Sequence, residues 1–102
     1  MRFDFHPEAR AEFRAAALWY EQEKTNLGRE FIDAVEAGIA AILENPTRFG
    51  PIEKGVRRCA LKRFPYRIHY LYSEQPQQVI IYAVMHVRRH PDYWKHRVPE
   101  SS

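Results

Sequence analysis

Cationic and aromatic side chains alternate along residues 57–70 of this 102-residue chain. Guanidinium and ammonium groups can hold a phosphate backbone, and aromatic rings between them can stack on nucleic-acid bases. The same composition suits a solvated, positively charged face that receives an acidic protein partner. The sequence leaves both alternatives open. The residues concerned are Arg57, Arg58, Lys62, Arg63 and Arg67, interleaved with Phe64, Tyr66 and Tyr70.

Two histidines indicate a second possible chemistry. His69 and His86 fall in neighbouring predicted strands, where a pair of imidazoles can serve as general acid and base if the strand register puts them on one face. The ordinary alternative, which we take first, is that each is a hydrogen-bonded structural histidine. His86 and His90 are four residues apart, but they straddle the end of a strand, and no carboxylate recurs with ligand spacing. We therefore expect no metal site and no cofactor.

Charge is divided unevenly between the two halves of the chain. Residues 1–51 contain six Lys/Arg and nine Asp/Glu, a balance of −3, whereas residues 52–102 contain ten and four, a balance of +6. Four of the five histidines also lie in the second half, so its charge rises on mild acidification. This asymmetry favours a polyanion or an acidic protein as partner, with a solvated basic face as the alternative.

Length and composition favour one domain, because either half alone would bury too little surface to fold. Cys59 is the single cysteine, so the chain has no intramolecular disulfide and no multi-cysteine metal site. Residues 1–8 contain no apolar run, so we expect neither a signal peptide nor a membrane span there. We expect a cytoplasmic domain over residues 1–97, a tail over residues 98–102, and no contact with membranes.

The first half predicts a strand followed by two helices. Residues 2–6 alternate polar and apolar, which predicts a strand with Phe3 and Phe5 on its buried face. Apolar residues at helical spacing predict helices over about residues 8–23 and 26–44. The polar residues 24–26 offer capping oxygens to the second helix, and Pro46 ends it. Because the connection is short, the helices are expected to form an antiparallel hairpin.

The second half predicts a three-stranded antiparallel meander over residues 56–61, 66–72 and 79–85, after a loop at 47–55. Residues 73–78 form the turn, and residues 91–97 form a last helical turn. The third of these strands is apolar on both faces, so it should not be an edge. The helices should cover one face of the sheet and leave the other more open. Strand alternation assigns Tyr66, Ile68, Tyr70 and Tyr72 to one face and Arg67, His69 and Leu71 to the other; it also separates Val79, Ile81, Ala83 and Met85 from Ile80, Tyr82, Val84 and His86.

Short sequence motifs spread over nearly the whole chain resemble those of the RelE/ParE superfamily of toxins from type II toxin–antitoxin pairs, and more closely those of its ParE-like branch. The resemblance implies this α+β fold. No single motif is decisive, but the order and spacing of the motifs together are specific. They are Ala17-x-Trp19-Tyr20-Glu21, Leu27-Gly28-x-x-Phe31, Pro46-x-x-Phe49, Val56-Arg57-Arg58, Arg63-Phe64-Pro65-Tyr66-Arg67-Ile68-x-Tyr70, Ile80-x-Tyr82-Ala83-Val84-x-His86-x-x-Arg89-x-Pro91-x-Tyr93-Trp94, and Arg97.

The resemblance implies a growth-arresting protein that is neutralised by an acidic antitoxin in a hetero-oligomer. ParE-like members poison DNA gyrase by protein contact, and RelE-like members cleave mRNA on the ribosome. We favour the gyrase alternative because the paired lysines of the RelE second strand are not reproduced here, where Cys59 and Ala60 stand. The ribonuclease alternative, and a non-toxic binding module of the same fold, stay open.

Each alternative implies its own set of site residues. For the ribonuclease, the catalytic candidates are Arg58, Arg67, Arg89 and His86. For the gyrase poison, the C-terminal segment would touch the target through Arg88, Arg89, Tyr93, Trp94 and Arg97, although Trp19–Tyr20 and Tyr93–Trp94 can also be read as anchors of helix ends on the core. The candidate antitoxin-binding residues are Arg57, Arg63, Arg67 and His69.

Overall fold

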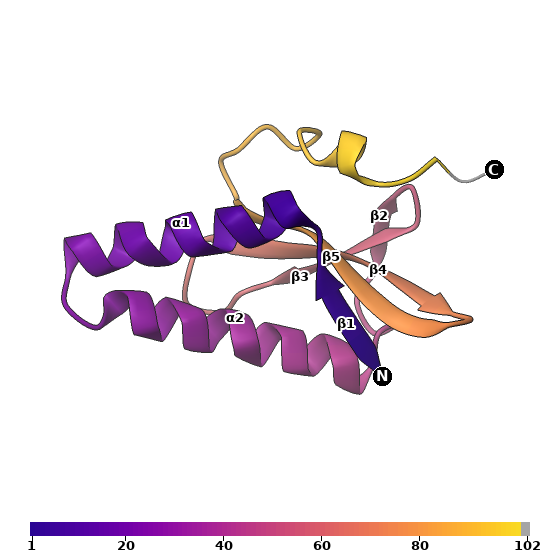
Figure 1. Ribbon diagram of the computed structural model, residues 1–102, viewed down its shortest axis with the longest axis horizontal. Helices are drawn as coiled ribbons and strands as arrows, with labels where there is room; N and C mark the ends of the chain where they lie inside the picture. The colour runs from indigo at the N-terminus through magenta and orange to yellow at the C-terminus, as the bar shows by residue number, and fades with distance from the viewer. Residues whose placement is uncertain (101–102) are drawn as a thin grey trace.

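The computed structural model, described here over residues 1–100, confirms both helices: α1 (Pro7–Glu23) and α2 (Leu27–Glu44). Nδ1 of His6 accepts a hydrogen bond from the Glu8 backbone N–H at 3.1 Å, and Pro7 occupies the first turn, where no intrahelical donor is needed. The chain leaves α2 at Asn45, directly before Pro46. The helices run side by side as the predicted antiparallel hairpin (Figure 1).

The turn between the helices is capped by Glu21 rather than by the polar residues expected to do so. Asn26 has a left-handed backbone with φ of 72°, and its side chain makes no capping bond. Instead, the carboxylate of Glu21 in α1 accepts hydrogen bonds from the backbone N–H groups of Asn26 and Gly28, at 3.0 and 3.1 Å. A side chain of the first helix thus satisfies the free donors of the second.

Five strands form one mixed sheet in the order β1-β5-β4-β3-β2. The meander of β3 (Val56–Ala60), β4 (Tyr66–Glu74) and β5 (Gln77–His86) is antiparallel, as predicted. β1 (Arg2–Phe5) adds to β5 in parallel, so β5 is internal, as its apolar character indicated. β2 (Pro51–Glu53) forms the opposite edge. The predicted α+β class is confirmed.

β2 lies in a segment that the sequence predicts to be a loop. It pairs antiparallel with β3 through a two-residue turn, in which Lys54 and Gly55 have φ of 56° and 78°. Tight hairpins favour positive φ at both central residues because that twist matches the strands. The Lys-Gly pair was therefore a hairpin signal, obscured by the shortness of the strand and its initial Pro51.

A β-bulge in β5 overturns the predicted alternation of its side chains. His69 pairs with Ala83 and Tyr70 pairs with Ile81, so Tyr82 has no partner on β4. An extra residue moves all later side chains to the other face. Val79, Ile81 and Val84 therefore share the helix side, whereas Ile80, Tyr82, Ala83 and Met85 share the opposite side.

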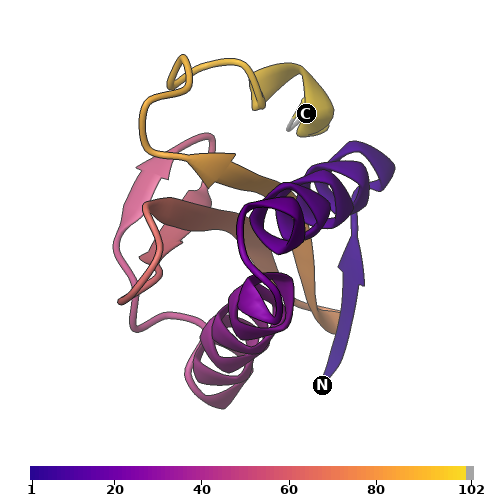
Figure 2. The same ribbon diagram turned by 90° about the vertical axis from the view of Figure 1, so that its left-hand side faces the viewer.

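The sheet separates two apolar clusters. The larger lies under the helices and includes the α2 stripe of Phe31, Val35, Ile39 and Ile42 with Ile68 and Tyr70. The face predicted to be open is instead covered by the C-terminal segment, residues 87–100, which lies over the sheet on the side away from α2 (Figures 1 and 2). This segment contains a 3₁₀ turn, η1 (Lys95–Arg97), where a last helical turn was expected. The smaller cluster consists of Val56, Tyr82, Ala83, Met85, Trp94 and Val98.

Two assignments near the termini were wrong. Phe3 shares the parity of Phe5, but β1 is an edge strand and the Phe3 side chain is exposed, whereas Phe5 packs against the larger cluster. Val98 was assigned to the tail, yet it is buried in the smaller cluster. Pro99 and Glu100 are exposed, and residues 101 and 102 lie outside the described range.

Replacing Gly28 by alanine should destabilise the fold. A Cβ on Gly28 would lie 2.5 Å from the Ala17 carbonyl oxygen and 2.9 Å from Cβ of Glu21, where the two helices cross. We expect Gly28→Ala to lower the free energy of unfolding by about 1–3 kcal/mol in urea denaturation. Gly50→Ala is the matched control, because a Cβ there meets nothing within 4 Å. Equal losses in the two variants would contradict this account of the crossing.

Candidate functional site

The C-terminal segment is fastened to α1 by a buried ion pair between Arg97 and Glu12. Nη1 and Nη2 of Arg97 donate to the two carboxylate oxygens of Glu12, each at 2.9 Å. The Arg97 side chain is 4% exposed and that of Glu12 14%, so the pair is largely removed from water. Burial opposes the charge on Arg97, but the bonds to Glu12 outweigh it and raise the pKa of Arg97. Such forked geometry also fixes the orientation of the two groups.

The same pair satisfies backbone groups at the bulge of β5. Strand β1 ends at Phe5, opposite Ile81, so the following residues of β5 have no strand on that side. There Arg97 donates to the Tyr82 carbonyl at 3.0 Å, and the Val84 N–H donates to Glu12 at 3.3 Å. The ion pair therefore continues the hydrogen bonding of the sheet beyond the end of β1.

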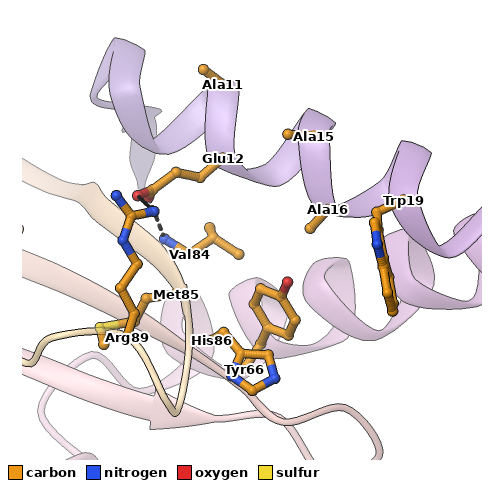
Figure 3. Close-up of a pocket in the computed structure, with 10 residues that line it drawn as sticks. All are labelled: Ala11, Glu12, Ala15, Ala16, Trp19, Tyr66, Val84, Met85, His86 and Arg89. Atoms are coloured by element: carbon orange, nitrogen blue, oxygen red, sulfur yellow. Dashed lines mark hydrogen bonds and ion pairs between the residues drawn. The ribbon is translucent and has the colours of Figure 1, made fainter.

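Glu12 also borders a pocket of about 450 Å³ between α1 and the end of β5 (Figure 3). Arg89 reaches across it toward Glu12, with 3.5 Å between nitrogen and oxygen, and lies 3.9 Å from the Tyr93 ring centroid. Tyr66 and His86 stand at its floor, with ring centroids 5.2 Å apart. The wall on α1 includes small side chains and Trp19, a residue that is 55% exposed.

A smaller pocket, of about 140 Å³, lies under the C-terminal segment. Its walls include Arg58, Arg67 and His69, and the Trp94 ring packs edge-on against His69 at 5.1 Å between centroids. His69 is 3% exposed. Burial, helped by the charges of Arg58 and Arg67, lowers the pKa of His69 from 6.5 to about 4, so the imidazole is neutral at pH 7.

A third hollow, of about 300 Å³, runs between α2 and β3. Its floor is made of small and apolar side chains, including Ala37, Gly38 and the buried Cys59. Its rim carries Arg48, Lys62 and Arg63. We call it the α2–β3 groove.

The four catalytic candidates are divided between two pockets. His86 and Arg89 line the pocket beside α1, whereas Arg58 and Arg67 line the pocket under the C-terminal segment. The sequence left open whether His69 and His86 share a face, and the structure separates them: His86 packs against Tyr66 on the helix side of the sheet, whereas His69 contacts Trp94 on the opposite side. The bulge is the physical reason, since it inverts the parity of β5 between Ile81 and Val84.

The five target-binding candidates divide by exposure. Arg88 and Arg89 are exposed in the turn after β5. Tyr93 is half-buried, and burial with Glu12 nearby raises the pKa of its hydroxyl. Trp94 is 1% exposed and donates from its indole nitrogen to the Pro91 carbonyl at 2.6 Å. Trp94 and Arg97 thus hold the C-terminal segment against the sheet, which agrees with the interpretation of Tyr93–Trp94 as a packing pair. Trp19 is 55% exposed and does not anchor the end of α1 on the core.

Two of the four antitoxin-binding candidates have polar partners within the chain, and the other two line the small pocket. Arg57 donates to the carbonyls of Thr47 and Phe49, at 3.3 and 2.7 Å, and so secures the loop before β2. Arg63 forms an ion pair with Glu30 of α2 at the rim of the α2–β3 groove. Arg67 and His69 lie in the small pocket described above. Only Arg63 therefore borders a groove beside the helices.

Sequence reasoning missed Glu12, which contacts Arg89, Arg97 and the backbone of β5. In the sequence it is one of several acidic residues on the polar side of α1. Its partner Arg97 is 85 residues away, and no local pattern connects them. The available signal was that Glu12 belongs to the acidic half of the chain and Arg97 to the basic half.

A comparison with protein-family models matches residues 3–91 to the ParE toxin of the type II toxin–antitoxin system parDE. The chain belongs to the ParE toxin family. A solved structure described as a chromosomal ParDE toxin–antitoxin system from P. aeruginosa superposes with a TM-score of 0.62 at 18% identity, covering 84% of this chain and 95% of that chain. At that identity the likeness supports the fold. A comparison with curated proteins finds no match.

Within residues 1–100 of this ParE-family chain, no helix combines the length and the apolar composition that crossing a bilayer requires. In the same range, no three side chains of histidine, cysteine, aspartate or glutamate converge as metal ligands.

Neutralising Glu12 should loosen the C-terminal segment. Glu12→Gln removes the two carboxylate bonds of the buried Arg97 and leaves only Glu8, whose oxygen lies 3.6 Å from Nε of Arg97, as a counter-charge. We expect a loss of about 3 kcal/mol in the free energy of unfolding, measured in urea. Asp33→Asn is the control, because it breaks the exposed ion pair with Arg29 and should cost no more than about 0.5 kcal/mol. If both variants lost the same amount, the buried pair would not have the role described here.

The lowered pKa of His69 predicts acid sensitivity. In the unfolded chain the imidazole takes up its proton near pH 6.5, whereas in the folded protein it does so only near pH 4. The free energy of unfolding is therefore unaffected by His69 above pH 6.5. As the pH falls from 6.5 toward 4, it decreases by about 3 kcal/mol in all, because only the unfolded chain takes up the proton. His69→Gln should remove this part of the pH dependence in urea titrations at pH 7.5, 5.5 and 4.5. His96→Gln, which changes an exposed ring, should retain it.

Proposed function

We propose that this chain is the growth-arresting toxin of a type II toxin–antitoxin pair, and that it acts in the cytoplasm by binding DNA gyrase. In this proposal the contact surface centres on the turn after β5. Arg88 is exposed there without a carboxylate partner among residues 1–100, and the neighbouring Val87 is 39% exposed. An unpaired cation beside an exposed apolar side chain suits protein contact, where an Arg can act as an anchor.

The observation that carries the choice of binding over RNA cleavage is the division of the catalytic candidates. Cleavage requires the base, the acid and the cationic groups to act on one phosphate. Arg58 and Arg67 border one pocket, and His86 and Arg89 another. The imidazole of His69 is buried beside the first pair. This arrangement supports a protein-binding toxin more strongly than a ribonuclease.

Neutralisation by an acidic antitoxin is the second part of the proposal. The α2–β3 groove has an apolar floor and a basic rim, with Lys62 free of carboxylate partners among residues 1–100. An amphipathic acidic segment could place apolar side chains on Ala37 and Gly38 and its carboxylates against Arg48 and Lys62. Complementary charge would accelerate the encounter and define its register. The expected complex is a hetero-oligomer.

Inducing the chain alone in bacteria tests the function. We expect growth arrest, inhibition of supercoiling by purified gyrase, intact transcripts, and rescue on co-expression of an acidic protein encoded next to the toxin gene. Arg88→Ala should relieve arrest without changing the melting temperature. Arg29→Ala is the control, because it removes an exposed arginine on α2 and should leave arrest unchanged.

Other outcomes would overturn parts of the proposal. Cleaved transcripts with normal supercoiling would favour the ribonuclease. Loss of arrest in Arg67→Ala, with arrest retained in Arg88→Ala and Arg89→Ala, would move the functional surface to the pocket under the C-terminal segment. Absence of arrest by the parent chain, folded and expressed, would indicate a non-toxic binding module.

A further inference from the structure

The small pocket under the C-terminal segment contains a buried polar group that nothing in the fold explains. His69 is 3% exposed, and neither of its ring nitrogens has a hydrogen-bond partner within the described chain. Native proteins rarely leave such atoms unpaired, because an unsatisfied buried polar group costs stability. The ring lines a cavity of about 140 Å³. The cavity is therefore positioned to hold whatever satisfies these nitrogens.

Two guanidinium groups border the same cavity. Arg58 is the cross-strand partner of His69, and Arg67 precedes it by two residues on the same face of β4. Neither arginine has a carboxylate partner among residues 1–100, in contrast to Arg63, Arg89 and Arg97. Their charges also help to lower the pKa of His69. Two unpaired cations that line the same cavity as an unpaired imidazole favour an anion in that cavity.

The acidic groups at the pocket are already engaged. Glu53 of β2 and Asp92 of the C-terminal segment both lie at its edge, and both form ion pairs with Lys95, that of Asp92 at 2.8 Å. These three charges together amount to one negative charge, against two positive charges from Arg58 and Arg67. The surroundings retain a net positive charge. A bound anion would thus compensate groups that the fold leaves uncompensated.

We propose that Arg58, Arg67 and His69 form a binding site for one small oxyanion of phosphate type, covered by the C-terminal segment. The two arginines supply fork-shaped donors, and the imidazole donates from one ring nitrogen. The volume suits an ion or a single phosphate group rather than a whole nucleotide, since pockets for drug-sized ligands start at about 300 Å³. This site goes beyond the proposed contacts with gyrase and antitoxin, and it does not depend on them.

The chemistry predicts that anion binding and protonation of His69 are coupled. A negative charge in the pocket offsets Arg58 and Arg67 and favours the imidazolium, so the pKa of His69 should rise when the anion binds. By linkage, the anion should bind more tightly as the pH falls from 7.5 to 5.5. Protonation of His69 and anion binding both depend on the charged groups around the pocket. These are Arg58 on β3, Arg67 on β4, Glu53 on β2, Asp92 and Lys95 in the C-terminal segment, and Glu12 on α1.

Inorganic phosphate is the probe for the test, titrated into the full-length chain at constant ionic strength with chloride as the balancing ion. We expect a saturable rise in melting temperature, roughly 6–11 °C at a tenfold excess over Kd. The NMR signal of the His69 ring should titrate with a pKa at least about one unit higher than in chloride. Adenosine 5′-monophosphate forms a second arm: tighter binding than phosphate would identify a nucleotide phosphate as the ligand, and equal or weaker binding the free ion.

Variants at the two arginines make the assignment specific. Arg58→Gln and Arg67→Gln should each weaken phosphate binding by at least about tenfold. Arg88→Gln is the matched control, because it removes an exposed, unpaired arginine outside the pocket and should leave binding unchanged. A rise in melting temperature that is equal in phosphate and chloride, or that survives in Arg58→Gln and Arg67→Gln, would overturn the site. An unaltered pKa of His69 at saturating phosphate would overturn the role of the imidazole.

Discussion

The structure depends on the buried ion pair between Glu12 and Arg97. It joins the first helix to the last turn of the described chain, and between them it satisfies the Tyr82 carbonyl and the Val84 N–H of β5. Removing two charges from water is costly, and a forked pair with further hydrogen bonds is the arrangement that offsets this cost best. The pair specifies where the C-terminal segment lies more than it adds to total stability.

The bulge and the ion pair require each other. At Tyr82 the strand gains a residue, and its backbone leaves the regular ladder just where β1 has ended. Without Glu12 and Arg97, the Tyr82 carbonyl and the Val84 N–H would be buried under the C-terminal segment without hydrogen-bond partners. With them, β5 can face two clusters, the helices on one side and Trp94 with Val98 on the other. A chain of this size thereby buries both faces of its sheet.

Most of the elements, though not β2, could be predicted from the sequence because their signals are local. The stripe from Phe31 to Ile42 and the proline after Asn45 define α2 without reference to the rest of the chain. The faces of β5 could not be predicted, because the bulge is stabilised by Glu12, 72 residues from Val84, and has no local signature. The same long-range contacts bury Arg97 and His69. Two residues assigned to binding surfaces, Arg97 and His69, are therefore buried by the fold, whereas Arg88 and Arg89 stay exposed.

The uneven distribution of charge between the two halves of the chain is partly explained by ion pairs within the fold. Acidic residues of the first half pair with basic residues of the second: Glu12 with Arg97 and Arg89, and Glu30 with Arg63. Glu12 joins α1 to the C-terminal segment, and Glu30 joins α2 to the loop between β3 and β4, so part of the +6 balance is compensated within the fold. What is left without a carboxylate partner among residues 1–100 includes Arg58, Arg67 and Arg88. Contacts within the fold do not account for these three arginines. They are therefore the strongest candidates for binding another molecule.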